Sequence, residues 1–293
     1  MTTTSSEYGA SADAIEYHYG TGNDYFALWL GDTMAYSSAL WDLDNPKQTL
    51  DEAQRAKIRH HIEQSRADKA QRVLDIGCGW GSVLFPLADN YKVNSITGLT
   101  LSDSQVNWIN GLDHPNIEAR LESWKDHTPD ENYDSIISIG AFEHFTKLGM
   151  SSEEKVEVYR EFFKKCHGWL NSKGCLSLQT VGYDNALPSS FDPFLAAEIF
   201  PETDTPFLAE ICKGCEHLFH VDLVYNHAEH YRLTLRAWYN NIKANRDACV
   251  AEKGEEEVAR FEKYLRLCAY MYEVGGLALY RLTLRRIDEP KVW

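Results

Sequence analysis

The stretch from Val73 to Ser82 reads VLDIGCGWGS, an apolar run that ends in three glycines, Gly77, Gly79 and Gly81. A short apolar run of this kind predicts a buried strand, and a helical pattern follows it through about residue 89. Glycines between a strand and a helix allow a tight turn and let a ligand approach the backbone at the positive end of the helix. The stretch therefore predicts a ligand-binding turn in an α/β fold.

The chain around this turn alternates strands and helices. Apolar runs at 93–99, 133–139 and 175–180 predict strands, with helices from about 102 and over 151–169. Such alternation is typical of a doubly wound, Rossmann-like parallel sheet with helices on both faces.

The flanking segments predict further elements. Upstream, Thr49 and Glu52 have the spacing of a capping box that opens a helix over 50–64. Downstream, 183–270 is mostly helical in pattern, and 277–285 alternates like an edge strand. We therefore expect a disordered tail at 1–10 and a single domain at 11–293. Its expected parts are an aromatic helical segment at 11–70, a ligand-binding core at 71–182, a helical cap at 183–270, and a final strand and tail at 271–293.

The composition excludes several classes of function. The chain has 293 residues and a net charge of −15, from 29 basic and 44 acidic residues. This balance argues against nucleic-acid binding and against adhesion to anionic membranes, both of which need Lys and Arg. No apolar run approaches the roughly 20 residues that span a bilayer, and no secretory signal is visible. We therefore expect a cytoplasmic protein whose seven cysteines are reduced.

Two kinds of cofactor are disfavoured. The glycine spacing is GxGxG rather than GxGxxG, and no acidic residue follows about 20 positions later, which argues against a dinucleotide. Cys212 and Cys215 form a single CxxC, and the histidines within 217–230 match no standard zinc spacing, so we expect no metal. An NAD-binding or non-catalytic module is therefore the less favoured alternative.

Longer motifs resemble one enzyme family. DIGCGWGS at 75–82, GLTLS at 98–102 and SIGAFEHF at 138–145 are similar to the cyclopropane-fatty-acid and mycolic-acid cyclopropane synthases. With similar stretches at both ends, the resemblance covers about residues 17–285. These enzymes are class I methyltransferases that use S-adenosylmethionine (SAM), so the resemblance implies that fold, that reaction class and that cofactor.

The resemblance also implies where SAM binds. The matching positions lie at the methionine part, at the ribose, at the adenine and in a segment that closes over the cofactor. In that order they are Gly77, Gly79, Thr100, Gln105, Ser123, Trp124, Tyr36 and Ser37. Hydroxyl and amide side chains suit ribose hydroxyls, and the face of a tryptophan suits adenine.

At the reacting end, the family uses a bicarbonate ion as base. The ion is held by a Glu, a His, a Tyr and backbone groups at a Cys and an Ile. Glu143, Tyr231 and Ile139 match the Glu, the Tyr and the Ile, whereas Gln179 stands at the His position and Ser38 at the Cys position. Glutamine can hydrogen-bond an anion but carries neither a charge nor a mobile proton. These changes argue against the ion and against ring closure.

Aromatic residues near the N-terminus offer walls for a cationic intermediate, because aromatic faces stabilise cations. Tyr19 and Tyr36 match cavity positions of the family. Tyr25, Phe26 and Trp29 have helical spacing and fit a buried core better. We expect His144 to face away from its neighbour Glu143, as adjacent residues usually do.

The sequence thus predicts a SAM-dependent C-methyltransferase acting on an alkene carbon of a hydrophobic small molecule, prenylated or fatty-acyl. A carbocation would form and lose a proton, with Glu143, Tyr231, Tyr19 and Gln179 as catalytic residues. One alternative is N-methylation of a small amine or alkaloid, because plant benzylisoquinoline N-methyltransferases look like relatives. The other is a true cyclopropane synthase on unsaturated acyl chains. A homo-oligomer is compatible with the sequence.

Overall fold

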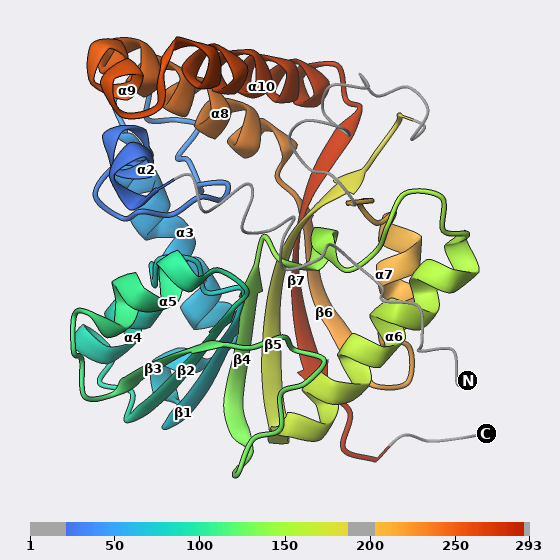
Figure 1. Ribbon diagram of the computed structural model, residues 1–293. Coiled ribbons are helices and arrows are strands. Elements are labelled where there is room, and N and C mark those ends of the chain that lie inside the picture. The colour runs from blue at the N-terminus through green and yellow to red at the C-terminus, as the bar shows by residue number, and fades with distance from the viewer. Residues whose placement is uncertain (1–21, 187–202, 290–293) are drawn as a thin grey trace, which may run out of the picture.

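The computed structural model describes residues 22–186 and 203–289, which form a seven-stranded sheet with helices packed on it (Figure 1). The strand order is β3-β2-β1-β4-β5-β7-β6. The strands are β1 (Arg72–Ile76), β2 (Ser95–Thr100), β3 (Ile117–Leu121), β4 (Tyr133–Ile139), β5 (Leu170–Tyr183), β6 (Phe219–Asn226) and β7 (Leu277–Arg286). This arrangement confirms the predicted α/β class.

The central strand β1 is buried on both faces, as a continuous apolar run predicts. Val73 belongs to one hydrophobic cluster and Leu74 to another, and both side chains are fully buried. β1 pairs in parallel with β2 and with β4, whose bounds agree with the predicted strand. The carboxyl ends of the three strands therefore meet at one edge, where ligands bind in open α/β sheets.

Two details of the sheet differ from the prediction. β7 is not an edge strand: it pairs antiparallel with β5 on one side and with β6 on the other. Its alternating pattern is misleading because β6 pairs with its outer side and seven of the ten residues of β7 are buried. β6 itself lies inside the segment predicted to be helical, and β3 was not predicted; both strands carry exposed residues.

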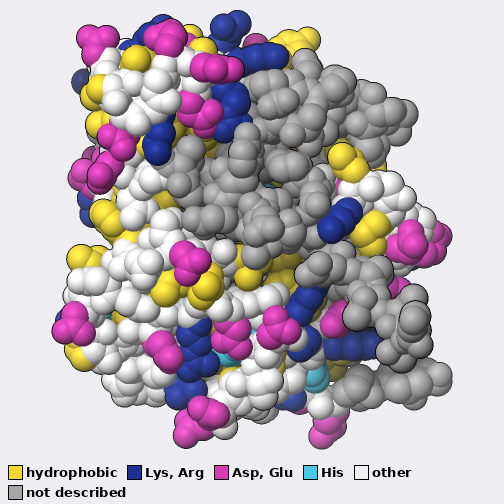
Figure 2. Space-filling model, viewed as in Figure 1, with side chains coloured by type: hydrophobic (Ala, Val, Ile, Leu, Met, Phe, Trp, Pro, Cys, Tyr) yellow, Lys and Arg dark blue, Asp and Glu magenta, His cyan; other side chains and the backbone are white. Residues whose placement is uncertain are grey.

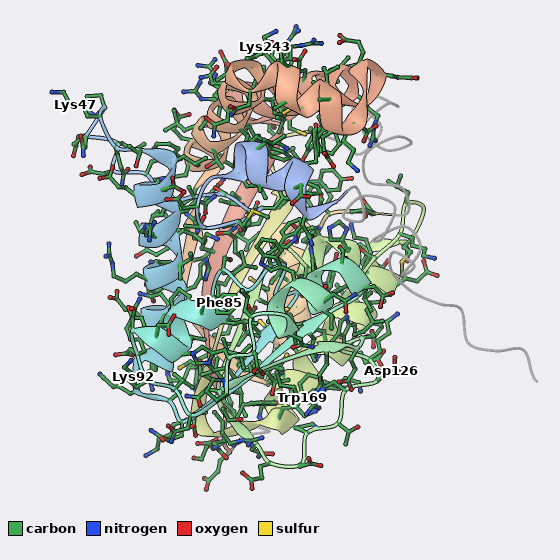
Figure 3. The ribbon with its side chains drawn as sticks, turned by 60° about the vertical axis from the view of Figure 1, so that its left-hand side comes forward. Lys47, Phe85, Lys92, Asp126, Trp169 and Lys243 are labelled. Carbon is green, nitrogen blue, oxygen red and sulfur yellow. The ribbon has the colours of Figure 1, made fainter. Side chains whose placement is uncertain are left out.

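The helices divide between the sheet faces and the end that carries the ligand edge. They are α2 (Asn23–Leu30), α3 (Leu50–Gln64), α4 (Leu84–Asp89), α5 (Asp103–Asn110), α6 (Ser152–Trp169), α7 (Leu208–Cys215), α8 (Ala228–Ala244), α9 (Arg246–Lys253) and α10 (Glu255–Glu273), with short 3-10 turns η1 (Ala67–Lys69) and η2 (Phe142–His144). Figure 1 shows α8, α9 and α10 together at one end, with α2 beside them. In Figure 3, Lys243 of α8 marks this end and Trp169 the opposite one.

The predicted cap is smaller than 183–270. α7 packs against α6, and β6 belongs to the sheet, so among the described residues of this segment α8 to α10 are the helices that lie over the strand ends. The predicted disordered tail at 1–10 lies outside the described residues. The capping box of α3 is confirmed: the Thr49 amide donates to Glu52 Oε2 at 2.8 Å, and the Glu52 amide donates to Thr49 Oγ1 at 3.3 Å.

The described surface carries mixed charges, and acidic and basic side chains alternate over the face seen in Figure 2. Within residues 22–186 and 203–289, no helix is both long and apolar enough to cross a membrane.

Candidate active site

Two adjoining pockets open where β1, β2, β4 and β5 end. The glycine pocket surrounds the turn with Gly77 and Gly79. The tyrosine pocket lies beneath α8 and α10 and is walled by tyrosines, namely Tyr36, Tyr183, Tyr231, Tyr264 and Tyr272. Both pockets are bordered by Tyr36, Ser37, Gly140 and His144, so a molecule in one can reach a molecule in the other.

The glycine pocket brings together every residue predicted to hold the cofactor. They come from the segment after α2, from the ends of three strands, from α5 and from the loop after β3. All of them line the pocket: Tyr36, Ser37, Gly77, Gly79, Thr100, Gln105, Ser123, Trp124 and Ile139. The individual contacts of these residues with SAM stay a prediction.

The two glycines of the turn have different roles, although both have a positive φ. A Cβ on Gly77 would lie 2.5 Å from the Cβ of Ala141, so this glycine allows two backbone segments to pack closely. A Cβ on Gly79 would meet no atom within 4 Å, so Gly79 faces the open pocket. Gly79 is therefore the position where a ligand can approach the backbone.

The polar side chains of the glycine pocket are arranged to receive hydroxyl and amino groups. Thr100 Oγ1 donates to Gln105 Oε1 at 2.6 Å, which fixes the Gln105 amide. Asp75, which sequence reasoning did not include in the site, is buried, and its Oδ1 has no hydrogen-bond partner. Burial raises the pKa of Asp75 to about 7, and the charge of Lys57 opposes that rise. A donor group of a bound molecule would satisfy Asp75, which fits SAM.

Trp124 forms a flat wall of the same pocket and is only 6% exposed. Its ring packs against Phe145 and Phe162, with centroids 5.0 and 5.4 Å away. Because these neighbours hold the ring in place, Trp124 offers a fixed aromatic surface, and its contact with the adenine stays a prediction.

The tyrosine pocket has a mainly apolar surface, with polar side chains of Ser, Thr, Gln, His and Glu residues set between its tyrosines and aliphatic residues. Among the described residues no lysine or arginine lines it, and its remaining walls include Val181, Leu235, Leu277 and Leu279. Its carboxylate is Glu143, which belongs to η2 directly after β4. Such a pocket suits a neutral, apolar acceptor better than a phosphorylated one.

Glu143 is buried, and its carboxylate accepts hydrogen bonds from the neighbouring strand β5. Thr180 Oγ1 donates to Glu143 Oε2 at 3.1 Å, and the Val181 amide also donates to the carboxylate. Burial outweighs these bonds and raises the pKa of Glu143 to about 7. The group can therefore take up or hold a proton near neutral pH.

The other predicted catalytic residues and the two backbone positions expected at the anion divide between the pockets. Gln179 and Tyr231 line the tyrosine pocket with Glu143, as does Ser38, whereas Ile139 lines the glycine pocket. Tyr19 lies outside the described residues.

His144 does not face away from Glu143, contrary to the prediction. It lines both pockets, because η2 bends the chain and turns two consecutive side chains to the same cavity. Its Nδ1 lies 2.9 Å from Thr203 Oγ1. Burial lowers the pKa of His144 to about 4, so the ring is neutral at physiological pH.

The aromatic residues of α2 belong to the core, as predicted. Tyr25, Phe26 and Trp29 are fully buried and pack against one another and against Phe261. Tyr36 contacts this cluster through Phe26 and Trp29 and also borders both pockets. The cluster thus supports the wall from behind.

Residues 35–41, which we call the strap, pass between the pockets and α3 and are held along their length. Gln54 Nε2 donates to Ala35 O and Ser37 O at 3.2 and 2.9 Å. The Ala39 amide donates to Thr234 Oγ1 at 3.0 Å, and the Trp41 amide to His230 Nδ1 at 2.9 Å.

One face of α3 carries three fully buried polar side chains that sequence reasoning missed: Gln54, Lys57 and His61. Lys57 Nζ donates to Ser37 Oγ at 2.9 Å, and His61 contacts Ser177 and Gln179. Their i, i+3, i+7 spacing places them on one helix face, which is the available signal, but polar residues in this pattern ordinarily indicate a solvated face.

The sheet, the glycine turn and the pocket at the strand ends define a class I SAM-dependent methyltransferase. The family model described as mycolic acid cyclopropane synthetase matches residues 7–282. The chain belongs to this family and is a SAM-dependent methyltransferase.

Named relatives agree with this. Cyclopropane mycolic acid synthase 1 of Mycobacterium tuberculosis is 32% identical over 291 residues, covering 93% of this chain and 96% of that protein. Cyclopropane mycolic acid synthase 2 of Mycobacterium leprae is 33% identical over 293 residues, covering 93% of each chain.

Comparison with solved structures also supports the family and the fold. The mycolic acid cyclopropane synthase CmaA1 complexed with SAH and CTAB has a TM-score of 0.84 at 31% identity, covering 96% of this chain and 100% of that one. Coclaurine N-methyltransferase has a TM-score of 0.78 at 20% identity, covering 96% and 84%, and shows the shared fold alone.

These comparisons confirm the predicted family, fold class, reaction class and use of SAM. They do not separate methylation without ring closure, the sequence's main prediction, from cyclopropane formation. The names of the relatives support the cyclopropane alternative better.

Proposed function

We propose that this enzyme transfers the methyl group of SAM to an alkene carbon of an apolar, unsaturated acyl chain and that the product closes to a cyclopropane. The observation that carries the proposal is the tyrosine pocket: apolar and tyrosine-walled, with Glu143 in its wall, and open to the glycine pocket.

The chemistry can be followed bond by bond. When bound, SAM supplies an activated methyl group. The alkene's electron pair forms a bond to this methyl carbon as the sulfur–carbon bond breaks, and the neighbouring acceptor carbon becomes a cation. Loss of a proton from the new methyl group leaves an electron pair that forms the second bond to the cationic carbon, which closes the ring.

The tyrosine pocket suits this intermediate. Aromatic faces stabilise a desolvated cation by ~2 kcal/mol or more each, and five tyrosines surround the cavity. Glu143 adds a carboxylate that can balance the positive charge or accept the released proton, because its pKa lies at about 7. An exposed site would instead let water capture the cation.

The replacement of the family's histidine by Gln179 leaves a site for an anion. Gln179, Glu143 and Tyr231 line the same pocket, so a bicarbonate ion could be held there by the Gln179 amide and the Tyr231 hydroxyl. When bound, bicarbonate supplies a base. The substitution alone is therefore no reason to exclude ring closure.

The test uses SAM that carries a CD3 group, together with a panel of unsaturated acyl chains. Both candidate products have the same mass with ordinary SAM, so the label is needed. A cyclopropane keeps CD2 in a ring that nuclear magnetic resonance identifies, whereas a methylated alkene or a methylated amine keeps CD3. Retention of CD3 in every product would overturn ring closure, and absence of methylation of any alkene would overturn the proposal.

A further inference from the structure

Arg281 is a buried cation directly behind Gln179. It lies in the middle of β7, and only 1% of the residue is exposed. Its Nε donates to Gln179 Oε1 at 2.7 Å, its Nη1 lies 2.7 Å from His227 Nδ1, and its Nη2 donates to Ser38 O and Ala39 O at 3.1 and 2.9 Å.

None of these partners is an acid. Within the described part of the chain Arg281 forms no ion pair, and its guanidinium is surrounded by two carbonyls, an amide and a histidine ring. Burying a charge without a counter-charge is costly for folding. A structural arginine would gain more from a carboxylate partner, so this arrangement indicates that the cation serves the neighbouring site.

The contact with Arg281 fixes which way the Gln179 amide points. An arginine can only donate hydrogen bonds, so the amide oxygen must face it and cannot exchange places with the nitrogen. The same oxygen lies 3.2 Å from His61 Nε2, which therefore carries the ring proton, while His61 Nδ1 accepts from Ser177 Oγ at 2.8 Å.

The nitrogen of this amide is left to the pocket. Gln179 Nε2 makes no hydrogen bond within the described residues, and Gln179 lines the tyrosine pocket together with Glu143 and Tyr231. The side chain thus presents an N–H donor at the position where the family has a histidine. A glutamine without such an anchor could equally present its oxygen, which would repel an anion or a carboxylate.

We propose that Arg281 is a positioning residue: it locks Gln179 with its N–H group toward the anion position between Glu143 and Tyr231 and holds the strap through Ser38 and Ala39. This inference rests on the proposed function, since the direction of the amide matters only if the tyrosine pocket carries out the reaction. Gln179 and Arg281 then act as one unit that replaces a single histidine.

The experiment exchanges the two residues separately and together. Arg281→Met should lower kcat by on the order of 10²-fold, as small misplacements in a site do, with little change in the KM for SAM. Gln179→His alone should also lower kcat, because the imidazole would face the donor groups of Arg281. The double variant should regain at least about tenfold in kcat over Arg281→Met. Its histidine can present a ring N–H to the pocket without Arg281 to orient it, and the neighbouring methionine has no donor group that would oppose the ring.

Arg285→Met is the matched control. Arg285 lies on the same strand and pairs with Asp222 at the surface, at 2.9 Å, so its loss should leave kcat unchanged. If Arg281→Met does not fold, Arg281→Lys in both backgrounds gives a weaker version of the comparison, because its three N–H donors cannot serve all four partners of Arg281 and kcat should fall in the same direction. Wild-type kcat in a folded Arg281 variant would overturn the proposal, and so would a double variant no faster than the single one.

A second readout does not depend on turnover. In protein labelled with 15N-glutamine, the side-chain amide of Gln179 should give a single, well-dispersed pair of signals in the wild type and in Arg285→Met, because the anchored amide has one orientation. Arg281→Met should lose this pair. If the wild type methylates no alkene but the signals behave in this way, the proposed function fails and the anchoring stands. Unchanged signals in Arg281→Met would overturn the anchoring itself.

Discussion

Replacing Glu143 by glutamine tests the centre of the proposed reaction. The amide has nearly the shape of the carboxylate and can still accept a hydrogen bond from Thr180, but it cannot take up a proton or balance a cation. We expect Glu143→Gln to bind SAM normally and to lose turnover by ~10²-fold or more.

The structure also gives the pH dependence. Burial moves the pKa of Glu143 from 4.5 to about 7, which corresponds to a bias of about 3 kcal/mol toward the neutral form. If the ionised form is the active one, wild-type kcat/KM should fall about tenfold for each pH unit below about 7 and level off above it. The variant should show no such limb.

The same carboxyl affects stability with a defined sign. Because its pKa is raised in the folded state, its contribution is fully present below pH 4.5 and is lost as pH rises through about 7. The unfolding free energy of the wild type relative to Glu143→Gln, from urea titrations, should therefore decrease over this window.

The assay is methyl transfer from labelled SAM, with calorimetry to confirm SAM binding. Glu153→Gln, an exposed change on α6, serves as the control that should alter neither activity nor its pH profile. Unchanged turnover in Glu143→Gln, or a flat wild-type profile between about pH 5 and 8, would remove Glu143 from the mechanism.

Four further changes probe the surroundings. Gly79→Val should lose SAM binding in calorimetry, because its side chain fills open pocket space and the φ of +55° is strained for a valine. Gly77→Ala, with its Cβ 2.5 Å from another Cβ, should lose about 1–3 kcal/mol of stability in thermal unfolding. Normal affinity in the first variant or wild-type stability in the second would contradict these roles. Thr100→Val removes the hydroxyl that fixes Gln105 and should raise the Kd for SAM by about tenfold, and an unchanged Kd would dissociate the pair from SAM binding. Burial lowers the pKa of Lys57 from 10.5 to about 7. The unfolding free energy of the wild type relative to Lys57→Met should therefore rise with pH across that interval. A difference that does not change with pH would mean that Lys57 is not desolvated.

Sequence reasoning located the parts of the site that are local in the chain. The glycine turn follows from Val73–Ser82 alone, since an apolar run, three glycines and a helix have one common arrangement in α/β folds. β4 was predicted with its correct bounds because a buried parallel strand is a continuous apolar run. Thr49 and Glu52 predicted the start of α3 correctly, because a capping box is formed by two residues that are only three positions apart.

Groups that depend on distant contacts could not be found in this way. Arg281 reaches Gln179 across 102 positions of sequence, and nothing near Arg281 distinguishes it from the exposed Arg285 on the same strand. His61 reaches Gln179 across 118 positions. β6 was missed although Phe219, Val221 and Leu223 alternate with polar residues, because this short pattern lies inside a segment whose overall pattern is helical. Most of β6 is exposed, so its apolar residues do not mark a buried face.

Groups on α3, α8 and β7 hold the backbone of the strap through hydrogen bonds within the protein itself. A segment held in this way costs little to order around a bound molecule, so we expect the wall that it gives the cavity to keep its shape. A cavity whose wall keeps one shape favours molecules whose own shape already matches it. Because a cis double bond imposes a permanent kink on a hydrocarbon chain, we expect the enzyme to discriminate between geometric isomers of its acceptor more sharply than between chain lengths.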